Sequence, residues 1–197
     1  MRISAQKLPQ VITLALGVIL VGIGIFIASQ NTVNLVQSSV SFASEPVEVQ
    51  GFNETEVTAE PRRILIPEIG IDLDVEVSEI VNGYWEVHED KAGWGMGSGV
   101  PSEIGNQVIF AHARKGLFGS LDEIKVNSKV YVLSEKTVEN EGGTNFWNEY
   151  EVTEIKEVYP NQTEVIKPVE DKEILTLYTC SGFNDNKRLI VIAEPVE

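Results

Sequence analysis

Two nearly uninterrupted apolar segments close to the C-terminus constrain the fold more than any other part of the sequence. They read Ile-Leu-Thr-Leu-Tyr at residues 174–178 and Leu-Ile-Val-Ile-Ala at residues 189–193. Short runs of this kind are typical of central strands that are covered on both faces. A polar stretch from Cys180 to Arg188 joins them. If the two strands lie side by side, a thiol and a guanidinium meet at one edge of the same sheet.

Further segments between residues 61 and 197 also have the composition of strands. Together with 174–179 and 189–193, they are residues 63–66, 73–77, 84–87, 108–112, 129–133 and 148–159. Apolar residues alternate in several of them, and Gly, Pro, Asn and Ser separate them. Only residues 89–92 and 117–124 favour short helices. The pattern therefore predicts an all-β domain with short helices, built as a sandwich or a closed barrel.

Residues 11–28 form a separate apolar run, VITLALGVILVGIGIFIA, in which Thr13 is the only polar side chain. As a helix this run would be about 27 Å long, close to the hydrocarbon thickness of a bilayer. Arg2 and Lys7 precede it, and the next basic residue is Arg62, which predicts a cytoplasmic N-terminus. A cleaved signal peptide is the alternative, but the run is long for that role, which favours a retained signal anchor.

The predicted organisation has four parts. Residues 1–10 are a cytoplasmic N-terminus, 11–28 a transmembrane signal anchor, 29–60 an extracellular stalk rich in polar residues, and 61–197 the folded domain. We therefore expect a single-pass protein of the cell membrane whose folded domain lies outside the cell.

Composition excludes several classes of function. The net charge of −15 would repel phosphate backbones, so we expect no nucleic-acid partner. One cysteine excludes an internal disulfide, and two histidines disfavour a multi-histidine metal site, so we predict no metal and no cofactor. An unpaired thiol is unusual in an extracellular domain, where oxidation is not reversed by cytosolic reductants. It is either a buried inert side chain or a reactive one.

The sequence around this cysteine carries a specific pattern. Residues 176–180 read Thr-Leu-Tyr-Thr-Cys, Arg188 follows at the start of the next predicted strand, and the segment 105–112 reads Gly-Asn-Gln-Val-Ile-Phe-Ala-His. Pro101 precedes that segment, and residues 116–121, Gly-Leu-Phe-Gly-Ser-Leu, come shortly after it. In this order the motifs resemble those of sortases, surface cysteine transpeptidases of mainly Gram-positive bacteria. The chain departs from the family at Ala111, where a glycine usually precedes the histidine.

The resemblance implies a closed eight-stranded sortase-type β-barrel behind a membrane anchor. It implies that Cys180 is the nucleophile, His112 the acid/base and Arg188 an electrostatic clamp. It also implies a sorting-signal substrate such as Leu-Pro-x-Thr-Gly, cut between Thr and Gly and then joined to an amine of peptidoglycan or of a pilin. The residues expected to contact the substrate are Thr179, Ala111 and Ser181.

The chemistry also follows from the residue types themselves. A thiolate is the reactive nucleophile, and positive groups near a thiol favour its ionised form. As an imidazolium, His112 can protonate the amine that leaves when a peptide bond breaks. Arg188 stays charged at every relevant pH and can donate several hydrogen bonds to a developing oxyanion.

Two other functions remain open at this point. The first is a cysteine hydrolase or an L,D-transpeptidase acting on peptidoglycan, although the latter places Gly directly before its cysteine and this chain has Thr179 there. The second is a surface β-barrel that binds a ligand without catalysis, in which case Cys180 would be inert. No motif surrounds His88, so we interpret it as a structural residue.

Overall fold

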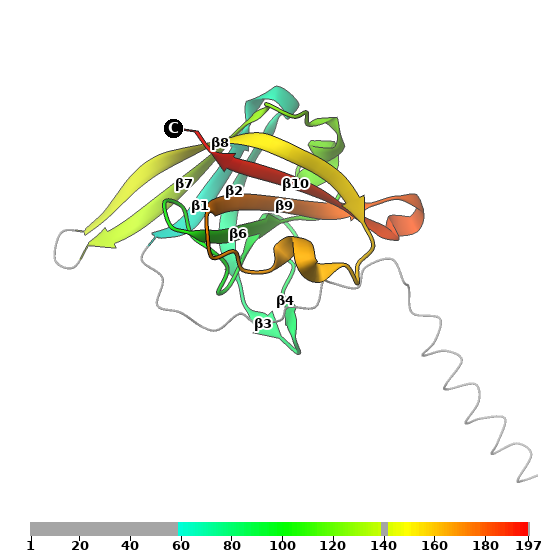
Figure 1. Ribbon diagram of the computed structural model, residues 1–197, viewed down its shortest axis with the longest axis horizontal. Helices are drawn as coiled ribbons and strands as arrows, with labels where there is room; N and C mark the ends of the chain where they lie inside the picture. Colours follow the sequence, from blue (N-terminus) through cyan, green and yellow to red (C-terminus); the bar gives the residue numbers. More distant parts are fainter. Residues whose placement is uncertain (1–58, 139–141, 197) are drawn as a thin grey trace, which may run out of the picture. The chain divides into compact units, whose positions relative to one another are not determined.

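The computed structural model describes residues 59–138 and 142–196, and the part it describes is mainly β-structure (Figure 1). Eight strands form a closed barrel in the order β1-β2-β5-β6-β9-β10-β8-β7. Neighbouring strands are antiparallel except for the pairs β2–β5 and β6–β9, which are parallel. The prediction of a closed eight-stranded barrel is confirmed. The strands are β1 (Ala59–Ile66), β2 (Ile71–Ser78), β5 (Ala92–Gly95), β6 (Gly105–Phe110), β7 (Lys129–Val138), β8 (Gly142–Val158), β9 (Glu173–Ser181) and β10 (Lys187–Pro195).

The barrel wall has an apolar core on each side. The inner cluster fills the barrel and draws on all eight strands, whereas the outer cluster lies against β6, β9 and β10. Strand β9 contributes to both, because successive side chains of a strand point to opposite faces: Leu175 and Leu177 belong to the inner cluster and Tyr178 to the outer one. The expectation that this strand is covered on both faces is confirmed. The outer cluster consists of Trp85, Val108, Phe110, Ile166, Tyr178 and Ile190.

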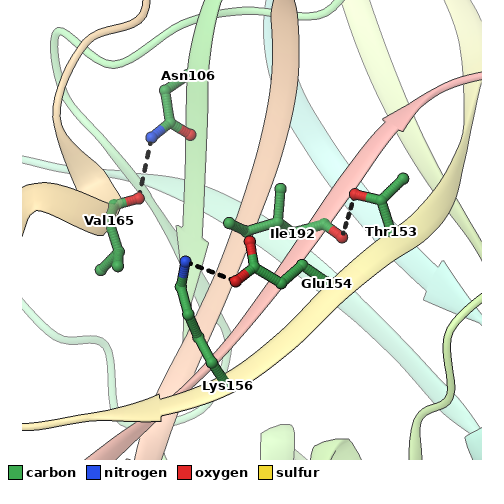
Figure 2. A network of polar contacts seen from close by, with 6 residues as sticks. All are labelled: Asn106, Thr153, Glu154, Lys156, Val165 and Ile192. Carbon is green, nitrogen blue, oxygen red and sulfur yellow. Dashed lines mark hydrogen bonds and ion pairs between the residues drawn. The ribbon is translucent and has the colours of Figure 1, made fainter.

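Two elements cover the outer cluster. One is a small two-stranded sheet formed by β3 (Ile80–Val81) and β4 (Tyr84–Trp85). The other is the connection between β8 and β9, which contains the 3-10 helix η3 (Thr163–Ile166). The Asn106 side chain on β6 fastens this connection, since its Nδ2 donates to the carbonyl of Val165 at 3.2 Å (Figure 2) and to that of Lys167 at 3.0 Å.

The sequence prediction was wrong around residues 84–92. Residues 84–87 were expected to form a strand of the domain, but only Tyr84–Trp85 is extended, and it lies outside the barrel. Residues 89–92 were expected to be helical, but the chain bends there and enters β5 instead. Glycine has low strand propensity, so the Ala-Gly-Trp-Gly sequence of β5 gives no strand signal. Its glycines are needed for close packing, because a Cβ at Gly95 would collide with the Trp85 indole.

The remaining elements are short or irregular. The predicted short helix at 117–124 is confirmed as the 3-10 helix η2 (Phe118–Glu123), and η1 (Pro67–Ile69) and η4 (Phe183–Asp185) are two further 3-10 turns. Strand β8 pairs with β10 through a register shift at Ile192, where Thr153 Oγ1 donates to the Ile192 carbonyl at 3.4 Å (Figure 2). Such a bulge increases the local twist and bends the strand, which helps a sheet to close on itself.

The predicted transmembrane anchor at 11–28 and most of the predicted stalk lie outside the described residues. Within the described part of the chain, no helix has the length and apolar character needed to cross a bilayer. The organisation of residues 1–58 therefore stays a prediction.

Candidate active site

Cys180 and Arg188 lie directly opposite each other on two neighbouring strands. β9 and β10 pair in antiparallel register, with Arg188 as the partner of Cys180 and Lys187 as the partner of Ser181. The chain reverses between these strands through a short turn in which Gly182 has φ 77° and Asn184 has φ 53°. Glycine and asparagine are the residues that adopt this left-handed conformation most readily. The expectation that one sheet edge brings a thiol and a guanidinium together is confirmed.

Arg188 is a buried cation held by backbone groups. Only 3% of the residue is exposed. Its Nη1 donates to the carbonyl of Asp185 at 2.9 Å and to that of Lys187 at 2.8 Å. Asp185 belongs to the turn between β9 and β10 and Lys187 is the first residue of β10, so these carbonyls hold the guanidinium close to the strand end that carries Cys180. A guanidinium keeps its charge even when buried, which makes it a permanent positive charge beside the thiol.

His112 lies at the same end of the barrel. The parallel pairing of β6 with β9 ends at Phe110 opposite Tyr178. Two more hydrogen bonds continue the alignment: Ala111 N donates to the Tyr178 carbonyl at 3.4 Å, and Thr179 Oγ1 donates to the Ala111 carbonyl at 2.7 Å. His112 directly follows Ala111, and Cys180 directly follows Thr179. His112 and Cys180 therefore lie just beyond this aligned pair, at the same end of the neighbouring strands β6 and β9.

The segment after His112 is fixed by backbone hydrogen bonds. The His112 carbonyl accepts from Arg114 N at 2.9 Å and from Phe118 N at 3.1 Å. The strand was predicted to continue through residue 112, but it ends at Phe110. Because this tight turn replaces the last part of the predicted strand, the side chain of His112 stays partly exposed, at 34%.

The Cys180 thiol is partly buried and free of any disulfide. Burial raises the pKa of the thiol, the nearby Arg188 guanidinium lowers it, and Asp185 raises it; the net result is a pKa above the ordinary value. A thiol with a raised pKa is protonated at neutral pH and needs a base to become a nucleophile. The aligned His112 imidazole is the group that can accept this proton.

A stack of three aromatic rings lies beside these residues. Trp85 stacks on Phe110 with ring centroids 5.8 Å apart, and Phe110 stacks on Tyr178 at 4.9 Å. Tyr178 is two residues before Cys180 in β9 and therefore faces the same side of the sheet. The sequence analysis missed this stack. A signal was present, because Phe110 and Tyr178 precede His112 and Cys180 by the same two residues.

The other residues predicted for the site are placed as follows. Thr179 and Ala111 are buried, 4% and 5% exposed, and bond to each other as described above. Ser181 is partly exposed at the end of β9, opposite Lys187. Their roles in substrate binding stay predictions. The Nε2 atom of His88 is 3.1 Å from the carbonyl of Val77 on β2.

An acidic residue that the sequence analysis did not single out contacts the histidine. Glu89 Oε1 is 3.8 Å from His112 Nε2, and its Oε2 is 3.0 Å from Arg114 Nη2. Glu89 was placed in a predicted helix, so no sequence signal pointed to this contact. Within residues 59–138 and 142–196, no group of three or more His, Cys, Asp or Glu side chains could hold a metal ion.

Comparison with known proteins places the chain in a family. The family model described as the sortase domain matches residues 64–196 of the chain. Sortase A of Bacillus anthracis is 31% identical over 136 residues, which cover 66% of this chain and 57% of that protein. The match thus spans less than two thirds of that relative's length.

Solved structures give the same result. A lid mutant of sortase A from Corynebacterium diphtheriae superposes with a TM-score of 0.54 at 27% identity, covering 74% of this chain and 73% of the other. Sortase C from Clostridium perfringens SM101 gives a TM-score of 0.54 at 25% identity, with the same coverage of 74% and 73%. The fold of this chain is therefore similar to that of sortases of more than one class.

Proposed function

Because this chain belongs to the sortase family, we propose that it is a cysteine transpeptidase that joins a sorting-signal protein to an amine acceptor. The observation that carries the proposal is the pairing of Cys180 with Arg188 across β9 and β10, with His112 just beyond the end of the neighbouring strand β6. The substrate proposed is a Leu-Pro-x-Thr-Gly-like signal, and the acceptor is an amine of peptidoglycan or of another surface protein. We further propose that residues 11–28 anchor the protein in the cell membrane with its catalytic domain outside.

The first half of the reaction forms a thioester. The Cys180 proton moves to His112, and the sulfur attacks the carbonyl carbon of the threonine in the signal. The tetrahedral oxyanion that develops is stabilised by the buried Arg188 cation. The C–N bond to glycine then breaks, and the proton on His112 passes to the departing amine.

The second half transfers the acyl group. An incoming amine attacks the thioester, the C–S bond breaks, and His112 accepts a proton from the amine nitrogen. The new amide joins the sorting-signal protein to its acceptor. The proton on His112 then passes to the Cys180 sulfur, because the raised pKa of the thiol favours its protonated form, and the enzyme returns to its resting state.

Intact-mass spectrometry of the full-length protein in detergent tests this proposal. The protein would be incubated with sorting-signal peptides, with and without a small amine. We expect a thioacyl adduct on Cys180 without the amine and a ligated peptide with it. Cys180→Ala, which removes only the partly buried sulfur, should retain the fold and form neither product.

Two results would contradict the proposal. An absence of adduct with every sorting-signal peptide would favour a non-catalytic surface barrel. A reaction with peptidoglycan tetrapeptides in place of sorting-signal peptides would favour an L,D-transpeptidase.

A further inference from the structure

Glu89 is a surface carboxylate with an unusual pair of contacts. It lies between β4 and β5, and its two carboxylate oxygens are used by different cations. Oε2 is 3.0 Å from Arg114 Nη2, and Oε1 is 3.8 Å from His112 Nε2. Both partners belong to the turn that follows β6, so one carboxylate links the β4–β5 connection to the histidine of the proposed site.

Two observations indicate that the contact with His112 matters. In the described part of the chain, Glu89 is the only acidic side chain in ion-pair contact with the imidazole. The Nε2 atom is buried and has no hydrogen-bond partner there, so the carboxylate is the group placed to interact with a charge on this nitrogen. Arg114 engages the other oxygen of this carboxylate, whose side chain is 79% exposed.

We infer that Glu89 is a positioning residue that stabilises the protonated form of His112 and thereby promotes ionisation of the Cys180 thiol. This inference rests on the proposed function only for its biological meaning; the coupling itself can be measured without a substrate. When the thiol proton moves to the imidazole, a neutral pair becomes a thiolate and an imidazolium. The negative charge of Glu89 lies on the imidazolium side and favours that state.

The charged groups around this pair set the expected size of the effect. His112 faces Glu89, Arg114 follows it in the same turn, and Cys180 has the Arg188 guanidinium beside it. Besides burial, the charged groups that shift the pKa of the Cys180 thiol are Arg188 and Asp185, and Glu89 is not one of them. The proposed effect of Glu89 is therefore the indirect one, through its contact with His112. For two charges 3.8 Å apart in water-like surroundings, the interaction changes an equilibrium constant about fivefold. The equilibrium concerned is the one between the neutral thiol–imidazole pair and the thiolate–imidazolium pair. Arg114 neutralises part of the carboxylate charge, which lowers the change to about threefold.

The test measures alkylation of Cys180 by iodoacetamide in the full-length protein, followed by intact-mass spectrometry from pH 6 to 10. Cys180 is the only cysteine, so the adduct is unambiguous. We expect Glu89→Gln to slow alkylation about three- to fivefold at pH 7. The ratio should fall toward one as the pH rises, because the thiol then loses its proton to solvent and no longer needs the imidazole to accept it. Equal rates at pH 7, or a deficit that persists at pH 10, would overturn the inference.

Two matched variants complete the design. Glu154→Gln removes a carboxylate from another exposed ion pair, 2.9 Å from Lys156 on β8 (Figure 2), and should leave the rate unchanged. In a His112→Gln background, Glu89→Gln should have no further effect; a further decrease would show that Glu89 does not act through His112. Melting curves establish that each variant is folded. If the coupling is found but no peptide acylates Cys180, the proposed function fails and this inference stands.

Discussion

Replacing Arg188 separates the charge of this residue from the geometry of its hydrogen bonds. The guanidinium has five N–H groups. Nη1 donates to the carbonyls of Asp185 and Lys187, which leaves at most three N–H groups for every other partner. A lysine has three N–H groups on one nitrogen, and after meeting the same two carbonyls it has at most one. Arg188→Lys therefore keeps the positive charge and loses most of the donors that could reach a substrate oxyanion.

The expected magnitude follows from that loss. Removing one preorganised donor from a developing oxyanion costs about 100- to 1000-fold in kcat. We expect Arg188→Lys to lose turnover of a sorting-signal peptide to this extent while keeping its fold. Arg188→Gln should lose at least as much. It should also raise the pKa of the Cys180 thiol further, because the guanidinium charge lowers that pKa in the wild type.

Two assays distinguish these effects. Peptide ligation, followed by chromatography and mass spectrometry, measures turnover, and iodoacetamide alkylation at pH 8 measures the thiolate fraction. Arg188→Lys should alkylate at close to the wild-type rate, whereas Arg188→Gln should alkylate more slowly. Turnover of Arg188→Lys within a few-fold of wild type would refute the reasoning, as would wild-type alkylation of Arg188→Gln. Circular dichroism and thermal melting monitor folding in each case.

Three further predictions concern the surroundings of the site. Asp185→Asn removes a negative charge that raises the pKa of the Cys180 thiol, so alkylation at a fixed pH near 8 should become faster; a slower rate would contradict the sign. Thr179→Val deletes the 2.7 Å hydrogen bond to the Ala111 carbonyl, and we expect a fall in kcat of about tenfold with little change in peptide KM, measured by steady-state ligation. Tyr150→Phe removes a hydroxyl that donates to the Glu173 carboxylate at 2.6 Å, which should lower the free energy of unfolding by about 2 kcal/mol. Urea unfolding measures this change, and an unchanged midpoint would argue against the bond.

Much of the barrel could be predicted because its central strands are recognisable as short apolar runs in the sequence. Residues 174–178 and 189–193 are apolar at nearly every position, and the structure covers both faces of these strands. Strand β5 could not be predicted in the same way. Gly93 and Gly95 are required there by close contacts with Ser78 and Trp85, and those contacts exist only after distant segments have packed.

The candidate site also has parts that the sequence predicts and parts that it does not. The pairing of Cys180 with Arg188 follows from two adjacent strands joined by a short turn, so the sequence order nearly dictates it. The alignment of His112 depends on a parallel pairing between β6 and β9 that no local pattern specifies; the family resemblance predicted it instead. Glu89 reaches the histidine from a connection that was wrongly expected to be helical, so its contact was not predictable from local propensity.

The parallel pairing of β6 with β9 has a consequence for how this protein acquires activity. The hydrogen bond between Thr179 and Ala111 joins residues 68 positions apart, and the strands between them occupy the far side of the barrel. Contacts of such long range form slowly, because the loop-closure entropy must be lost before they are gained. A molecule whose barrel is still open holds every reactive group yet has no assembled catalyst. Ligation activity should therefore appear only once β6 and β9 have paired during refolding, and the enzyme can serve as its own reporter of that pairing.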